Sequence, residues 1–210
     1  SPAQRRKHGA RTKMTRPLRM GLLLFGLATL LACGGTPHKD SFYRLPVVET
    51  GEGQAAISDG PIIYIPPFDA DGLHGERALV YAHDDGTSLE QYTYHYWADS
   101  PRLLLQQALA ARVRGTRRVV TTPSAEAGYT LRGRIVRLEV QDTGKGATAE
   151  VGLEFELSPV DTDVPVFSRS VKRSVALGNE DISARVGALA TAAQDALASV
   201  VEDLNGFWGR

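Results

Sequence analysis

Residues 149–157 read AEVGLEFEL, in which apolar side chains alternate with other side chains at every position. A period of two is typical of a β-strand that buries one face and leaves the other in solvent. The positions predicted to face the core are Ala149, Val151, Leu153, Phe155 and Leu157. Because this is the least ambiguous pattern in the chain, we take it as the centre of a predicted β-sheet.

Neighbouring segments predict the strands that pair with it. Residues 129–140 form a long strand pattern whose apolar face switches near Ile135 and Val136, which indicates a β-bulge or a change of environment. Residues 143–146 predict the turn between this strand and the central one. Residues 166–176 predict a third strand, which follows a loop at 159–165.

Two segments predict helices. The first begins at Ser100-Pro101, since serine caps free backbone N–H groups and proline fits the first helical position, and Gly115 ends it. Its apolar face comprises Leu104, Leu105, Ala108, Leu109 and Val113. The second helix runs from about Asp181 to Leu204, and its apolar stripe comprises Ile182, Val186, Leu189, Ala193, Ala196, Val200 and Leu204. The order of elements predicts an α+β fold, a single domain with a mixed or antiparallel β-sheet and two main helices packed on one face.

The first half of the chain predicts shorter strands. Residues 42–48, 61–65 and 118–121 fit single strands. Residues 77–82 and 89–97 fit the two arms of a hairpin, with Asp85-Gly86 as the turn signal between them.

The second arm of this hairpin is rich in aromatic residues. Regular alternation would place Glu90, Tyr92, Tyr94 and Tyr96 on one face of the strand. The aromatic side chains either pack in the core or form a surface that faces a partner or lipid, because Tyr and Trp carry contact energy at interfaces. The candidate partner-binding residues are therefore Tyr92, Tyr94, Tyr96 and Trp97.

The charge is unevenly distributed along the 210 residues. The chain has 24 basic and 24 acidic residues, but residues 1–32 contain seven basic residues and no acidic one. The remainder thus has 24 minus 7, or 17, basic residues against 24 acidic ones, a net charge of −7. This balance argues against nucleic-acid binding, which favours basic surfaces.

Residues 1–32 predict a signal peptide with an N-terminal extension before Met14. Arg16 and Arg19 precede an apolar run at 21–31, which is shorter than the about 20 residues of a transmembrane helix. Leu30-Leu31-Ala32-Cys33 resembles a lipobox, so we expect cleavage between Ala32 and Cys33 and lipid attachment to Cys33. The alternative is a plain signal peptide followed by a chance cysteine.

The predicted organisation has three parts. Residues 1–32 are the leader, residues 33–48 are a lipidated tether with the first strand, and residues 49–210 are the α+β domain. Cys33 is the only cysteine, which excludes a disulfide within the chain. Gly34 follows it, and resemblance to enterobacterial lipoproteins then favours the outer membrane over the inner membrane.

The sequence predicts no catalytic residue, no metal site and no cofactor. Gly-x-Ser-x-Gly, phosphate-loop and His-Glu-x-x-His patterns are absent from it. His83-Asp84-Asp85 has the residue types of a metal site, but a solvated turn explains it more simply. Three arginines, Arg132, Arg134 and Arg137, are likewise expected on the solvated outer face of their strand.

Several segments together resemble the ABC-type transport auxiliary lipoproteins of the paraquat-inducible protein C type. They are residues 77–81 (RALVY), residues 89–92 (LEQY), Trp97, Pro101 and the helix from Leu104 onward. Residues 43–45 (YRL) and the pattern Tyr129-x-Leu131-x-Gly133 also fit. The resemblance covers most of the chain after Cys33, and its motifs are structural.

The resemblance implies an adaptor or docking subunit that is lipid-anchored on the periplasmic face of the outer membrane. Its partners would be an MCE-domain protein with its permease and ATPase, which move lipids or other hydrophobic molecules between two membranes. Self-association of the chain is compatible with this role, and no enzymatic activity is expected. The alternative is an outer-membrane assembly factor or an activator of a cell-wall synthase.

Overall fold

The computed structural model describes residues 38–46, 60–83, 86–143, 146–178 and 181–209. The predicted leader, Ala32 and Cys33 lie outside the described residues, as does the centre of the His83-Asp84-Asp85 turn. The described residues from Lys39 onward form one compact unit. The predicted α+β class, with a mixed sheet and two main helices in a single domain, is confirmed.

The two longest strands form the centre of the sheet. β7 (Ala127–Asp142) pairs with β8 (Ala147–Pro159) in antiparallel orientation, and β8 pairs in the same way with β9 (Phe167–Leu177). The residues of β8 that were predicted to face the core are all no more than 1% exposed: Ala149, Val151, Leu153, Phe155 and Leu157. The predicted bulge is also confirmed, since the register shifts between Ile135 and Arg137 and leaves Val136 without an opposite residue.

Short strands occupy the other edge of β7 one after another. β2 (Ile62–Tyr64), β3 (Asp69–Ala70) and β4 (Ala78–Ala82) all pair with it in parallel orientation. A 3₁₀ turn, η2 (Gly72–Gly75), separates β3 from β4, and β6 (Val119–Val120) pairs with β2. β3 and η2 were not predicted from the sequence.

The predicted hairpin and the first strand complete the sheet. β4 pairs in antiparallel orientation with β5 (Leu89–Trp97), as predicted. β1 (Ser41–Tyr43) pairs in parallel orientation with the end of β5, so it belongs to the sheet although the sequence grouped it with the tether.

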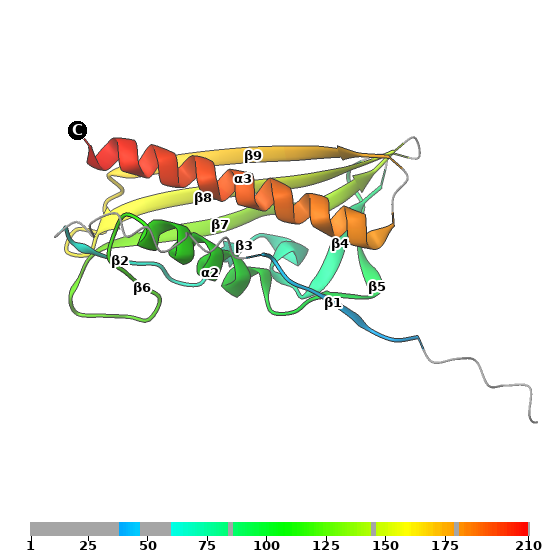
Figure 1. Ribbon diagram of the computed structural model, residues 1–210, viewed down its shortest axis with the longest axis horizontal. Helices are drawn as coiled ribbons and strands as arrows, with labels where there is room; N and C mark the ends of the chain where they lie inside the picture. Colours follow the sequence, from blue (N-terminus) through cyan, green and yellow to red (C-terminus); the bar gives the residue numbers. More distant parts are fainter. Residues whose placement is uncertain (1–37, 47–59, 84–85, 144–145, 179–180, 210) are drawn as a thin grey trace, which may run out of the picture. The chain divides into compact units, whose positions relative to one another are not determined.

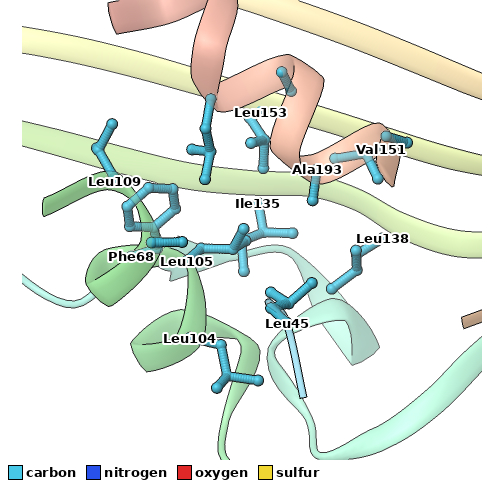
Figure 2. Close-up of a cluster of buried hydrophobic side chains, with 14 of the residues drawn as sticks. Leu45, Phe68, Leu104, Leu105, Leu109, Ile135, Leu138, Val151, Leu153 and Ala193 are labelled. Atoms are coloured by element: carbon cyan, nitrogen blue, oxygen red, sulfur yellow. The ribbon is translucent and has the colours of Figure 1, made fainter. Parts of the chain in front are cut away.

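The helices α2 (Pro101–Arg114) and α3 (Ile182–Trp208) pack over this sheet (Figure 1). α3 contacts β7, β8 and β9, and α2 contacts α3 and β6. Figure 2 shows Leu105 and Leu109 of α2 in one cluster with Ile135, Leu153 and the α3 residue Ala193. The apolar stripes predicted for the two helices therefore bury against the same sheet.

The start of α2 differs from the prediction. The Ser100 side chain makes no capping hydrogen bond, and its hydroxyl instead donates to the Gly75 carbonyl at 3.2 Å. The side chain thus links the helix to η2. A contact between residues 25 positions apart depends on the tertiary fold and leaves no local sequence signal.

Candidate docking surface

Tyr94 breaks the alternation of β5. Its φ of +67° lies in the left-handed region, which is uncommon for a residue with a side chain. The register of the hairpin shifts at the same place, because Ala78 pairs with Tyr96 while Val80 pairs with Gln91. The prediction that Tyr92, Tyr94 and Tyr96 share one face is therefore wrong, because the extra residues reverse the side-chain direction beyond Tyr94.

Tyr92 lies on the side of the sheet that carries α3. Its ring is 4.5 Å from that of Tyr81, and its hydroxyl accepts a hydrogen bond of 2.9 Å from Arg185 of α3. Arg185 also donates to Asp142 at the end of β7, at 3.0 Å. Tyr92 thus helps to tie β5 to α3.

Trp97 belongs to the core. It is 1% exposed and is the largest fully buried side chain among the described residues. Core packing, the alternative considered for the aromatic cluster, accounts for this residue. Tyr94 and Tyr96 keep solvent-exposed surface, and a partner-binding role for these two stays a prediction.

Tyr96 forms a surface with two residues that the sequence did not single out. Its ring stacks on that of Phe42 in β1 at 5.8 Å between centroids, and the guanidinium of Arg77 lies 5.6 Å from the Phe42 centroid. Phe42 is 57% exposed. We call Phe42, Arg77 and Tyr96 the β1–β5 surface. Residues 42, 77 and 96 are far apart in the sequence, so only strand pairing brings them together.

A hollow of about 410 Å³ lies against the β1–β5 surface. Its lining adds Asp40, Glu76, Ala78 and Gln91 to those three residues. Backbone carbonyls fix the position of Arg77, since its Nε donates to Trp97 at 3.3 Å and its Nη2 to Ala98 at 3.1 Å. One fixed cation and two carboxylates therefore face the same hollow.

A charge network around two buried carboxylates, Glu139 and Glu150, connects β7, β8, β9 and η2. Arg137 donates to Glu150 at 2.6 Å, and Lys172 contacts the same carboxylate at 3.1 Å. Burial opposes the charge of Glu150, but the hydrogen bonds from these two cations outweigh it and hold the pKa of Glu150 below its ordinary value. Arg137 also contacts Glu139, which is 2% exposed.

His74 is the last member of this network. Its Nε2 lies 3.4 Å from a Glu139 oxygen, and its Nδ1 accepts a hydrogen bond from the Leu138 backbone N–H at 3.4 Å. The imidazole thus occupies the gap between β3 and β4 along β7. Burial lowers the pKa of His74, and Glu139 opposes this only in part. The neutral ring is the form that accepts from Leu138.

His83 and His95 pair with nearby side chains. His83 Nε2 lies 3.0 Å from Glu90, and the Tyr43 hydroxyl lies 3.0 Å from His95 Nδ1. The Tyr81 hydroxyl donates to Glu90 at 2.6 Å, which lowers the pKa of that carboxyl. Within the described residues, no group of three or more His, Cys, Asp or Glu side chains is placed to hold a metal ion.

The three arginines of β7 meet carboxylates on the face that was predicted to be solvated. Arg132 pairs with Asp163 at 2.7 Å, and Arg134 pairs with Asp71 at 2.6 Å. Arg137 pairs with Glu150 as described above. These contacts neutralise the arginines and do not form an anion site.

The fold is an α+β domain with a mixed sheet and two main helices. The sequence identifies the family of this domain, since residues 43–203 match the model for the ABC-type transport auxiliary lipoprotein component. The chain belongs to this family, which is a family of transport components. No curated protein matches the sequence significantly.

Solved structures share the fold. Protein XCC0632 from Xanthomonas campestris is 19% identical, with a TM-score of 0.62 over 80% of this chain and 93% of that one. The hypothetical protein CT253 from Chlamydia trachomatis is 8% identical, with a TM-score of 0.50 over 70% of this chain and 96% of that one. Among the described residues, no helix is long and apolar enough to cross a membrane.

Proposed function

We propose that the protein is the adaptor subunit of an ABC-type MCE transport system and is lipid-anchored to the periplasmic face of the outer membrane. The observation that carries the proposal is the family match over residues 43–203. The partners would be an MCE-domain protein with its permease and ATPase, as the resemblance of the sequence implies. Self-association of the adaptor is compatible with this arrangement.

Cys33 supplies the anchor in this proposal. It is the only cysteine, it follows Ala32 directly, and it precedes the first residue of β1 by eight positions. A lipoprotein family is the expected setting for a cysteine in this place. Three acyl chains would hold the protein firmly, because each buried methylene contributes about 0.8 kcal/mol.

An adaptor works through contact and position, and the internal chemistry of this domain fits that role. The buried carboxylates Glu150 and Glu139 both have partners, since Arg137 and Lys172 contact Glu150, and Arg137 and His74 contact Glu139. Their charges and hydrogen bonds are therefore used within the fold. We propose on this basis that the protein catalyses no reaction.

Affinity capture tests the proposal. The lipidated protein would be captured from detergent-solubilised envelopes, and the bound proteins would be identified by mass spectrometry. We expect enrichment of an MCE-domain protein, a permease and an ATPase. Enrichment of outer-membrane assembly factors or of a cell-wall synthase instead would contradict the MCE assignment.

Histidine variants test the absence of catalysis. We expect His74→Gln, His83→Gln and His95→Gln, made singly, to leave envelope-barrier function nearly unchanged, because glutamine keeps polarity but cannot serve as an acid or base near neutral pH. The readout is resistance of the cells to compounds that the envelope excludes. A well-folded variant that abolishes this resistance would revive an enzymatic or metal-dependent role.

A further inference from the structure

We infer that the β1–β5 surface rests on the headgroup region of the bilayer that holds the lipid anchor. The occupant of the hollow beside this surface would be a zwitterionic phospholipid headgroup. The inference rests on the anchoring at Cys33 proposed above. It assigns the exposed face of Tyr96 to lipid, where the sequence left partner and lipid as alternatives.

Chain length restricts where this surface lies. Phe42 follows Cys33 by nine positions. Nine extended residues span at most about 32 Å, at no more than about 3.6 Å each. Because Phe42 pairs with Tyr96 in the sheet, the whole surface stays within about this distance of an anchored Cys33.

The exposed residues have the chemistry of the membrane–water interface. An aromatic ring presents an apolar body, and arginine combines an apolar stem with a charged end, so both are favoured at headgroup depth. Phe42 exposes 57% of its surface, although a side chain of this size is usually buried in a soluble domain. Contact with lipid would remove this apolar surface from water.

The hollow carries both signs of charge. Two hydrogen bonds to carbonyls use two of the five N–H groups of the Arg77 guanidinium, and the hollow is lined by this residue together with Asp40 and Glu76. A phosphodiester fits the guanidinium and an ammonium group fits the carboxylates.

A segment with several exposed apolar residues lacks this chemistry and therefore serves as a control. It contains Val160, Val164 and Val166, which are 54%, 62% and 46% exposed. The same segment carries Asp161 and Asp163 and has no aromatic side chain. Residues 160–166 therefore offer no guanidinium to a lipid phosphate and no aromatic ring to the membrane–water interface.

A fluorescence experiment separates the two surfaces. The chain from Cys33 onward would be coupled through its single thiol to a maleimide lipid in vesicles of phosphatidylethanolamine and phosphatidylglycerol. Phe42→Trp and Val164→Trp would each be made in this chain, and brominated lipids would quench tryptophan after subtraction of the Trp97 and Trp208 signal. We expect at least about twofold more quenching at position 42, because interfacial side chains sit about 5–10 Å into the headgroup boundary.

Equal quenching at the two positions, or none at position 42, would overturn the inference. If Phe42→Trp does not fold, hydrogen exchange of the unsubstituted chain decides, and we expect slower exchange in residues 41–43 and at Tyr96 when vesicles are present. Unchanged exchange there would overturn the inference as well. Arg77→Gln removes the guanidinium that we assign to the lipid phosphate. We therefore expect this variant to show less quenching at position 42 in vesicles that contain phosphatidylethanolamine.

The coupling to lipid is chemical, so the result does not depend on natural lipidation. An unacylated Cys33 in the cell would contradict the proposed anchoring and leave the vesicle result standing. Conversely, an acylated chain without quenching at position 42 would overturn only the inference. Loss of capture of the MCE-domain protein by Tyr96→Ala, together with no quenching at position 42, would assign the surface to a protein partner and overturn the inference.

Discussion

Phe155 connects the central strand of the sheet to the segment that precedes η2. Its side chain is 1% exposed, and its ring meets that of Phe68 edge to face at 5.7 Å between centroids. Aromatic pairs in this geometry add to the stabilisation from burial. Phe68 also lies in the cluster with Leu105 and Leu109 of α2 (Figure 2), so Phe155 supports both layers of the domain.

We expect Phe155→Ala to lower the free energy of unfolding by about 3–5 kcal/mol, because it removes a buried ring and leaves a cavity. Chemical denaturation monitored by circular dichroism measures this change. The matched control is Val164→Ala, at a position that is 62% exposed, where we expect a change within about 0.5 kcal/mol. A loss below about 1 kcal/mol for Phe155→Ala would show that the ring is not buried as described.

His74 makes the stability depend on pH. Burial lowers its pKa in the folded state below the ordinary value of 6.5, so the unfolded chain takes up the proton first as the pH falls. Stability is therefore lost as the pH falls through 6.5 towards the folded-state pKa and levels off below it. Glu150, whose pKa is lowered from 4.5, adds a separate loss at more acidic pH.

We expect His74→Gln to flatten the stability profile as the pH falls through 6.5, before the more acidic loss from Glu150 begins. The glutamine amide can accept from the Leu138 N–H and donate to Glu139, but it does not titrate in this range. Urea unfolding of both proteins at several pH values provides the measurement. If the free energy of unfolding of the variant still changes with pH as steeply as that of the unsubstituted protein, a group other than His74 causes the pH dependence.

β7 needs a glycine where it crosses the core. A Cβ at Gly133 would lie 2.5 Å from the ring of Phe68, closer than side chains approach in folded proteins. The ring therefore packs directly on the strand backbone. Gly187 in α3 is the opposite case, since a Cβ there would meet no atom within 4 Å.

We expect the same substitution to have opposite effects in these two elements. Gly133→Ala should destabilise the protein by about 1–3 kcal/mol, because the ring must move within a packed core. Gly187→Ala should stabilise it by about 0.5–1 kcal/mol, because alanine loses less backbone entropy in a helix. Thermal unfolding of the pair tests both signs, and stabilisation by Gly133→Ala would mean that Phe68 packs elsewhere.

The sequence predicted those strands and helices that bury the same face along their whole length, because this burial produces a regular pattern of apolar residues. β8 alternates regularly because one face meets the helices along its length, and the switch at Val136 predicted the bulge because an extra residue reverses the side-chain direction. The left-handed turn at Tyr94 could not be predicted, since tyrosine carries no preference for it. The candidate surface was only partly predicted, because Phe42 and Arg77 join Tyr96 through strand pairing.

At the scale of the whole molecule, charge and anchor act together. Residues after 32 carry a net charge of −7, so the domain as a whole is not drawn to an anionic membrane surface. Firm attachment would then depend on acyl chains at Cys33, with the β1–β5 surface orienting the domain. This division of roles predicts that loss of the cysteine releases the protein, whereas changes in the surface alter only its orientation.

We expect Cys33→Ser to yield an uncleaved or soluble precursor, because serine has no thiol to form the thioether and the chain has no other cysteine. Intact-mass measurement of envelope and soluble fractions checks this, with the acylated N-terminal Cys33 expected only in the unsubstituted protein. Thr36→Ser is the matched control, because it introduces the same residue three positions away and should leave processing unchanged. The anchor would be refuted if the N-terminus of the unsubstituted protein lies at another residue, or if the protein carries no acyl mass. Any membrane attachment would then have to come from another part of the chain.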